Sequence, residues 1–317
     1  MKAILLQKNG GVENLILSEV TDPVLKPGEV MIQVKAIGIN PIDATVRRDN
    51  QRMTAVLKPV EDQKEIILGW DVSGTIVETG NELHKWQGKD VFGMVNFPGQ
   101  GKAYAELVAA PVSQLAEKPA NIAHEEAAAA SLAALTAWQA LVSNAGVTKG
   151  DKVLIHAAAG GVGHYAVQIA KSFGAYVIGT ASGANRDFVL GIGADEFIDY
   201  NKQRFEETIT DADVVLDSID DRNHLLRSIQ ALKSGGRLVS IKTNFDDEIN
   251  RWFSEKKISP YRILVKSNGD DMRQIASLLA DGRIKSHISA IFRFEELPKA
   301  HEQIESQRTR GKIVVKV

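Results

Sequence analysis

The sequence contains no cysteine among its 317 residues. This absence excludes disulfide bonds, thiolate zinc sites, iron–sulfur clusters and cysteine nucleophiles together. A chain without cysteine also fits a reducing compartment, where disulfides are rare. We therefore predict a cytoplasmic location.

Aromatic residues are scarce as well, at 6% of the chain, and neither sign of charge dominates. The 38 Lys and Arg residues stand against 40 Asp and Glu residues, which leaves a net charge of -2. Nucleic acids and acidic membrane surfaces are bound by basic patches, and single-stranded nucleic acids by aromatic platforms too. The composition therefore argues against nucleic acid or a membrane as the main partner.

Long apolar runs are missing. The most apolar stretch, residues 127–138, is rich in alanine and far shorter than the roughly 20 residues that span a bilayer. The apolar run at the N-terminus is too short for a signal peptide. The apolar fraction of 44% and the charged fraction of 25% are typical of a globular protein. At about 150 residues per domain, the length suggests two domains.

The first 120 residues carry mostly strand signals. Residues 30–36 alternate between apolar and polar side chains, and this alternation fades at residues 37–39, where we expect the strand to end. Further strands are expected at residues 71–78, 91–94, 104–108 and 113–115. Glycines and prolines separate these segments. The pattern predicts a small antiparallel barrel or sandwich.

The rest of the chain alternates between helices and strands. After a long helix at 124–143, strands are expected at 152–156, 175–180, 196–199, 214–217 and 237–241. Helices are expected at 162–173, from about 184, and at 222–233, with two more at 270–280 and 297–306 before a last strand at 312–317. Alternation of this kind is typical of an α/β fold, in which helices cover both faces of a parallel sheet.

The strongest local signal is a glycine-rich turn between a strand and a helix. Small residues at such a turn allow a tight bend, a close approach to a pyrophosphate and close packing of the helix on its strand. The N-terminus of the helix then offers free N–H groups to the phosphates. The strict G-x-G-x-x-G pattern is not met, because Ala158 stands at its first glycine. In this context we predict a dinucleotide site at Ala159, Gly160, Gly161, Val162 and Gly163, with a purely structural turn as the alternative.

The residues after the next strand indicate the cofactor. NAD sites usually place a carboxylate there, about 20 residues beyond the glycines, to bind the ribose 2′-hydroxyl. Here Ser182 offers a hydroxyl group and Arg186 a guanidinium, which could bind a 2′-phosphate. We therefore predict NADPH as the cofactor; the alternative for Arg186 is a solvated surface residue.

Seven segments stand out in order along the chain: VKAIGINPID (34–43), GWDVSGTIVETG (69–80), SLAALTAWQAL (131–141), IHAAAGGVGHYAVQIAK (155–171), GADEFIDY (193–200), LKSGGRLVSI (232–241) and RGKIVVKV (310–317). Taken together, they resemble the medium-chain dehydrogenase/reductase superfamily, in particular its zinc-independent quinone oxidoreductase branch. The resemblance implies a GroES-like β-barrel catalytic domain at residues 1–122, a Rossmann NADPH-binding domain at 123–266 and a return segment at 267–317. It also implies that cofactor and substrate meet between the domains.

The resemblance extends to positions at which the zinc enzymes of the superfamily hold their catalytic metal. The first two positions are Asn40 and Trp70, and the third falls near Leu132. A tetrahedral zinc site needs three protein ligands of N, S or O type, and Trp and Leu cannot serve. We therefore expect no metal. His156 and His164, which flank the glycine turn, are expected to pack or to cap a helix.

Roles for single residues also follow from the resemblance. Asn40 is expected beside the nicotinamide and the substrate, where its amide can donate to a carbonyl oxygen as charge develops; its alternative is a cap for the helix that starts near Pro41. Cofactor contacts are implied for Thr136, Tyr200, Ile241, Lys242 and Thr243. A basic cluster of Arg308, Arg310 and Lys312 offers one more residue that could reach the 2′-phosphate.

The region that would shape the substrate pocket departs from the family pattern. Thr45 stands where some members place an aromatic residue, and residues 48–65 lack the usual Gly/Pro-rich loop. Three functions stay open: an NADPH-dependent quinone reductase, an NADPH-dependent alkenal or enone double-bond reductase, and a non-catalytic NADPH-binding stress or regulatory protein. A homodimer is expected from the resemblance.

Overall fold

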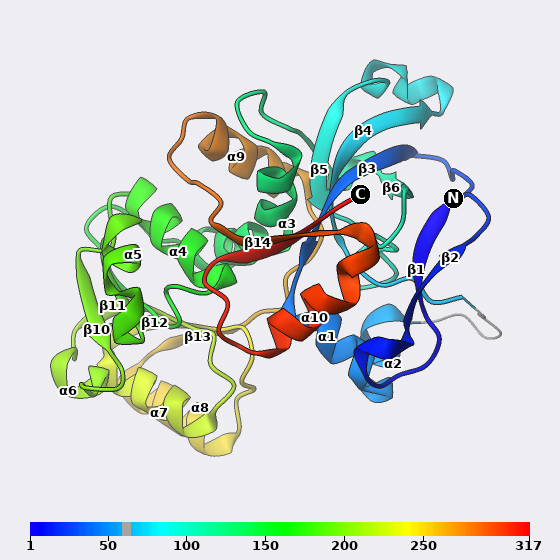
Figure 1. Ribbon diagram of the computed structural model, residues 1–317. Coiled ribbons are helices and arrows are strands. Elements are labelled where there is room, and N and C mark those ends of the chain that lie inside the picture. Colours follow the sequence, from blue (N-terminus) through cyan, green and yellow to red (C-terminus); the bar gives the residue numbers. More distant parts are fainter. Residues whose placement is uncertain (59–64) are drawn as a thin grey trace. The chain divides into compact units, whose positions relative to one another are not determined.

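The computed structural model describes residues 1–58 and 65–317, which fall into two compact units (Figure 1). Unit 1 comprises residues 1–135, 265–282 and 286–317, and unit 2 comprises residues 136–264 and 283–285. In the described part of the chain, no helix is both long and apolar enough to cross a membrane.

Helix α3 (His124–Trp138) accounts for the main difference between these units and the predicted domain boundaries. The boundary was expected before this helix, yet most of it belongs to unit 1. The physical reason is its alanine-rich face, because Ala128 and Ala129 pack in a buried cluster with Ala36 and Val314. A short π-helix, Gln139–Asn144, continues α3 within unit 2.

Unit 1 is built on a seven-stranded sheet with the order β14-β15-β3-β4-β5-β7, in which β6 also pairs with β3. All pairs are antiparallel except β14 with β15. A separate hairpin joins β1 and β2. The bounds are β1 Lys2–Leu6, β2 Leu15–Glu19, β3 Glu29–Ile39, β4 Asp71–Thr79, β5 Asp90–Met94, β6 Leu107–Pro111, β7 Ala116–Glu117, β14 Ile288–Arg293 and β15 Lys312–Lys316. The predicted antiparallel architecture is confirmed.

Strand β3 runs further than the sequence suggested. Its apolar alternation fades after Ala36, but residues 37–39 are all buried and still pair with β4 or β15. Alternation is lost here because both faces of the strand are covered. At Gly38 a Cβ atom would lie 2.7 Å from the Ala128 carbonyl oxygen of α3, so the helix packs directly on the strand.

Besides most of α3, the helices of unit 1 are α1 (Pro41–Arg48), α2 (Asn50–Leu57), α9 (Gly269–Ala280) and α10 (Leu297–Glu305). Helix α2 lies in the region of residues 48–65, which lacks the Gly/Pro-rich loop that is usual in the family. Asp49 caps it, since its carboxylate accepts the backbone N–H groups of Gln51 and Arg52. The helix ends at Lys58, which has a left-handed backbone. Residues 59–64 of this region lie outside the described residues.

Unit 2 contains a six-stranded parallel sheet with the order β10-β9-β8-β11-β12-β13. The bounds are β8 Lys152–Ile155, β9 Tyr176–Ala181, β10 Glu196–Asp199, β11 Ala212–Asp217, β12 Leu232–Ser240 and β13 Ser259–Arg262. The strand order reverses between β8 and β11. This is the doubly wound Rossmann arrangement, which binds ligands at the carboxyl ends of the strands beside that reversal.

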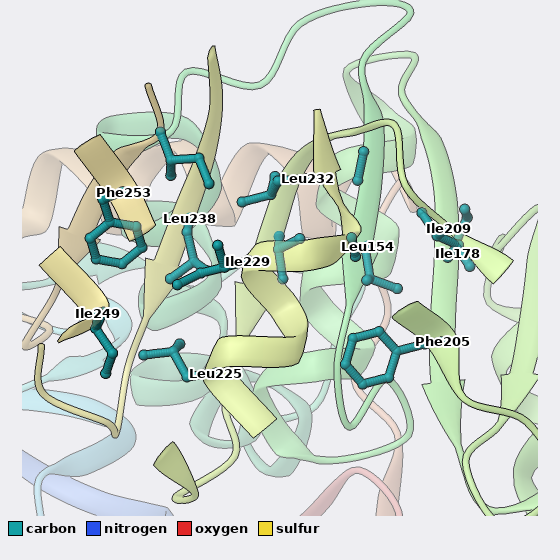
Figure 2. Packing of buried hydrophobic residues seen from close by; sticks show 14 of the residues in the cluster. Leu154, Ile178, Phe205, Ile209, Leu225, Ile229, Leu232, Leu238, Ile249 and Phe253 are labelled. Carbon is teal, nitrogen blue, oxygen red and sulfur yellow. The ribbon is translucent and has the colours of Figure 1, made fainter. Parts of the chain in front are cut away.

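Helices cover both faces of this sheet. They are α4 (Gly161–Ser172), α5 (Arg186–Gly191), α6 (Phe205–Thr208), α7 (Arg222–Ala231) and α8 (Asp247–Lys256). On one face, Leu225 and Ile229 of α7 join a buried cluster with Leu154 and Ile178 of the sheet (Figure 2). The neighbouring residue Gly179 points the other way, because its Cβ would lie 2.6 Å from Val189 of α5. The predicted α/β fold is confirmed.

Candidate active site

The glycine-rich turn connects β8 to α4 as predicted. Ala157 has a positive φ of 49°, and the Gly160 N–H donates to its carbonyl oxygen at 2.8 Å. The ideal Cβ of a residue at position 163 would lie 2.1 Å from that same oxygen, so only glycine fits. Residues 161–163 open helix α4, where N–H groups lack partners within the helix. The turn can therefore present several N–H groups to an anion.

The predicted 2′-phosphate residues gather at the carboxyl ends of β9 and β10. Ala181 pairs with Asp199, so Ser182 and Tyr200 follow at the same edge of the sheet. The Ser182 hydroxyl oxygen accepts from Asn185 at 3.0 Å, and Tyr200 is 58% exposed. Arg186 begins α5 and is exposed.

A carboxylate that the sequence analysis did not consider lies at this edge. The ideal Cβ of a residue at position 183 would lie 2.5 Å from Asp199 Oδ2, so the carboxylate packs against Gly183. Asp199 Oδ1 accepts from the backbone and the side-chain amide of Asn201. Its place at the end of a strand next to β9 was the available signal. The edge thus carries both signs of charge.

The predicted residues after β12 lie beside the end of β11. The Ile241 N–H donates to the Asp217 carbonyl oxygen at 3.1 Å, and the Thr243 hydroxyl donates to that of Ile219 at 3.0 Å. The Lys242 carbonyl oxygen accepts from Arg262. These residues share the carboxyl edge of the sheet with the glycine turn. Thr136 is different, since it lies in α3, where it is 5% exposed.

Beneath this edge, on the α7 side of the sheet, lies a buried polar network that the sequence did not reveal. The Ser228 hydroxyl donates to Asp217 Oδ2 at 2.7 Å and lies 3.1 Å from His156 Nε2. His224 Nδ1 lies 3.0 Å from the same carboxylate oxygen, and His156 Nδ1 lies 3.0 Å from the Thr180 hydroxyl. Burial lowers the pKa of His156 to about 3, so this imidazole is neutral.

His156, Asp217 and His224 offer three possible metal-ligand atoms within 4.8 Å of one another. These atoms already bind each other or a hydroxyl group, with Ser228 joining Asp217 to His156. Among the described residues this is the one such group. Its hydrogen bonds account for the cluster, so we assign it a structural role. His164 has a similar role, because its Nδ1 donates to the Gly160 carbonyl oxygen at the start of α4.

Replacing His156 with glutamine should flatten the loss of stability in mild acid. Unfolded histidine takes up a proton below a pH of about 6.5, whereas folded His156 stays neutral down to about 3. Stability from this residue is thus complete above about pH 6.5 and falls by about 1.4 kcal/mol per pH unit below it. Thermal melts of His156→Gln and wild type between pH 7 and 4, with exposed His84→Gln as control, measure the difference. Parallel curves would contradict the assignment of a neutral buried imidazole.

In unit 1, three residues from distant parts of the chain form a second buried polar cluster. The Asn40 side-chain Nδ2 donates to Asp71 Oδ2 at 2.8 Å, and its Oδ1 accepts from Lys312 Nζ. Lys312 also donates to the Ile39 carbonyl oxygen at 3.0 Å and lies 3.6 Å from Asp71 Oδ2. All three residues are at most 2% exposed. Lys312 was predicted as part of a basic cluster open to a 2′-phosphate, and its burial beside Asn40 corrects that expectation.

A second carboxylate adjoins this cluster. Asp43 Oδ2 accepts the Asn40 backbone N–H at 2.7 Å, so it caps the start of α1. Burial raises the pKa of Asp43 to about 7 and that of Asp71 to about 6, while Lys312 lowers both. The Tyr104 hydroxyl lies 2.9 Å from His301 Nε2, and burial raises its pKa well above 10. Unit 1 therefore holds two acidic groups and one ammonium group away from solvent.

The three positions that resemble zinc ligands do not fit a zinc ion. Asn40 already uses its amide oxygen to accept from Lys312. The Trp70 indole N–H donates to the Gly99 carbonyl oxygen at 2.8 Å, and Leu132 has an apolar side chain. A metal ligand needs a free lone pair. At Asn40 the amide oxygen is already engaged, and the Trp70 and Leu132 side chains have no suitable lone pair to offer. These positions do converge, because Asp71 follows Trp70 and its Oδ1 accepts the Leu132 N–H at 2.8 Å.

Comparison with known proteins identifies the family. The model of the alcohol dehydrogenase GroES-like domain matches residues 26–120, and that of the zinc-binding dehydrogenase matches residues 192–315. A quinone oxidoreductase of Sus scrofa is 30% identical, with 99% of this chain and 97% of that protein covered. The chain belongs to the medium-chain dehydrogenase/reductase superfamily. It falls in the quinone-oxidoreductase-like branch of that superfamily and is an oxidoreductase.

Two other relatives of this superfamily bear on the activity. The NADPH-dependent alkenal/one oxidoreductase of Arabidopsis thaliana, named as chloroplastic, is 30% identical and covers 99% of this chain and 79% of its own. The solved structure of a quinone oxidoreductase from Coxiella burnetii is 34% identical, with a TM-score of 0.91, and covers 100% of this chain and 99% of its own. The family, the GroES-like domain and the Rossmann domain predicted from the sequence are thus confirmed.

Proposed function

We propose that this chain is a zinc-independent reductase that transfers a hydride from NADPH to a quinone. The observation that carries the proposal is the set of side chains at the positions resembling zinc ligands. Trp70 and Leu132 offer no metal ligand there, and the Asn40 amide oxygen accepts from the buried Lys312 ammonium. A quinone suits such a site. Its negative charge spreads over a phenolate during reduction, whereas oxidation of an alcohol needs an alkoxide to be stabilised, a task that a metal ion performs well.

The chain's own residues divide the work of this reaction. NADPH supplies the hydride when it is bound. The N–H groups of the turn at residues 160–163 bind its pyrophosphate, with Ala159 beside them, and Ser182, Arg186 and Tyr200 bind its 2′-phosphate. Contacts to its nicotinamide half come from Thr136, Ile241, Lys242 and Thr243. Asn40 donates its remaining Nδ2 hydrogen to the substrate oxygen on which charge develops.

Cofactor preference is tested by removing Arg186. A charge-assisted hydrogen bond to the 2′-phosphate is worth roughly 1.5–3 kcal/mol, so Arg186→Ala should raise the KM for NADPH more than about tenfold. The KM for NADH should stay nearly unchanged, because NADH lacks that phosphate. Arg251→Ala, an exposed arginine on α8, is the matched control. Equal losses for both cofactors would count against the assignment, as would a lower KM for NADH than for NADPH in the wild type.

The second candidate function is reduction of the carbon–carbon double bond of an enal or enone, which the Arabidopsis relative favours by its name. NADPH oxidation with 1,4-benzoquinone, 9,10-phenanthrenequinone and a simple enone distinguishes the two. We expect faster turnover of the quinones. Faster turnover of the enone than of both quinones would move the assignment to double-bond reduction. NADPH binding without turnover of any acceptor would instead support a non-catalytic stress or regulatory protein.

We also propose a homodimer. Strand β13 is an edge of the unit 2 sheet, and Leu264 just beyond it is 55% exposed. An edge strand offers unpaired N–H and C=O groups to a second copy. Light scattering on the purified protein should give twice the chain mass of 34.5 kDa, and the mass of a single chain would overturn the proposal. The predicted cytoplasmic location stays a prediction.

A further inference from the structure

Lys312 is a buried ammonium group at a place where burial is costly. It begins β15, is 2% exposed, and donates to the Ile39 carbonyl oxygen and to Asn40 Oδ1. Moving a charged group out of water costs several kcal/mol unless it is paired and hydrogen-bonded. Asp71 provides the opposite charge, with its Oδ2 3.6 Å from Nζ. Two buried groups thus hold one amide side chain between them.

This arrangement fixes which way the Asn40 amide faces. An ammonium group only donates hydrogen bonds, and an ionised carboxylate only accepts them. The amide oxygen must therefore face Lys312, and the amide nitrogen must face Asp71, as the structure has them. A reversed amide would bring Nδ2 against the ammonium and Oδ1 against the carboxylate. One hydrogen of Nδ2 is used by Asp71, so a single hydrogen in a fixed direction is left for another acceptor.

The surroundings hold this pair rigidly. Asp71 Oδ1 accepts the Leu132 N–H at 2.8 Å, and the Asn40 N–H donates to Asp43 at 2.7 Å. At Gly38 a Cβ would lie 2.8 Å from Asp71 Oδ2, so strand β3 touches the carboxylate. Backbone N–H groups of Asn40 and of Leu132 in α3 thus hold the two acidic side chains. The Lys312 ammonium group lies beside Asn40, the first of the three positions that resemble zinc ligands.

We infer that Lys312 is a positioning residue that orients the Asn40 amide, the first of the positions that resemble the ligands of the zinc-dependent relatives. The inference rests on the proposed function, since it assumes that the Asn40 N–H meets the substrate oxygen. The neutral isostere methionine fills a similar volume without the charge or the hydrogen bonds.

The test compares three variants with the wild type. Lys312→Met alone leaves Asp71 as a buried charge without its partner, and Asp71→Asn alone leaves Lys312 as one. Each single variant should therefore have a lower Tm than the wild type. The double variant Lys312→Met/Asp71→Asn has no buried charge at this pair, and its Tm should recover toward that of the wild type. Its kcat should remain about a hundredfold low with an unchanged KM for NADPH, since an amide group at position 71 can pair with either orientation of the Asn40 amide. Lys316→Met, on the same strand but at the surface, is the control and should keep full kcat.

A double variant whose kcat recovers together with its Tm would overturn the inference, because a merely structural ion pair predicts that result. Nitrogen-15 NMR of the Asn40 side-chain amide gives a readout that needs no substrate. In the wild type, slow hydrogen exchange and two separate Nδ2 proton signals are expected, and in the double variant fast exchange. An amide that is equally protected in both proteins would also overturn the inference. If the wild type reduces no acceptor, the proposed function fails, and the NMR comparison still decides whether Lys312 orients Asn40.

Discussion

Replacing Asn40 with alanine is expected to lower kcat by about 10²–10³, the effect of removing one hydrogen-bond donor from a site that stabilises a developing oxyanion. The dissociation constant for NADPH should change little, because the turn and edge residues that we propose to bind the cofactor belong to unit 2. The expected loss is large because the Asn40 amide is buried and held by Lys312 and Asp71. A fixed donor stabilises charge without first having to reorganise.

Stopped-flow measurement of NADPH oxidation, together with fluorescence titration of NADPH, separates these two effects. The melting temperature of the variant must be measured alongside, since Lys312 and Asp71 lose a shared partner. They remain within ion-pair distance of one another, at 3.6 Å, so the fold should persist. A loss that appears mainly in NADPH affinity, with kcat retained, would contradict a role for Asn40 at the substrate and leave it as a helix cap.

Replacing Gly163 with alanine is expected to weaken NADPH binding by about tenfold to a hundredfold. One added methyl group would lie 2.1 Å from the Ala157 carbonyl oxygen and 2.8 Å from Ala158 Cα. These are backbone atoms of the turn itself, so they cannot rotate aside as a side chain can. Overpacking of this kind costs about 1–3 kcal/mol, and it displaces the N–H groups that would meet the pyrophosphate.

Gly191→Ala provides a matched control for this substitution. Gly191 ends α5 in the same unit, and a Cβ there meets nothing within 4 Å. The control should bind NADPH like the wild type and melt at the same or a slightly higher temperature. Calorimetric titration with NADPH measures both variants. Equal affinity of Gly163→Ala and Gly191→Ala would show that the turn does not hold the phosphates as proposed.

The parts of the fold that the sequence predicted well rest on local signals. The glycine turn, its strand and its helix occupy consecutive residues, and the alternation of strands and helices in unit 2 has a clear period. Helix α2 was not predicted, although Asp49 is a good N-cap, because residues 48–65 were compared only with the family's loop, which they lack. Strands β1, β2, β13 and β14 and helix α8 were missed too. Strand β13 shows why, since it contains Pro260 and is mostly exposed.

The candidate site shows more clearly which features could not be predicted from the sequence. Asn40 was singled out, but its partners Asp71 and Lys312 lie 31 and 272 residues away along the chain. No periodicity links such positions, and Lys312 resembled any solvated residue of a basic C-terminal segment. The network of His156, Asp217 and Ser228 is likewise assembled only when the parallel strands pair. Local chemistry could be predicted from the sequence, whereas the burial that gives these groups their roles could not.

One measurement tests the central claim, direct hydride transfer from NADPH without a metal, more directly than any variant. The wild-type enzyme is dialysed against a strong chelator, its zinc content is determined, and single turnovers of a quinone are followed with NADPH and with NADPH deuterated at nicotinamide carbon 4. We expect no stoichiometric zinc, an unchanged rate after dialysis, and slower oxidation of the deuterated cofactor. Loss of the rate on chelation with recovery on adding zinc, or equal rates for the two cofactors, would contradict this claim.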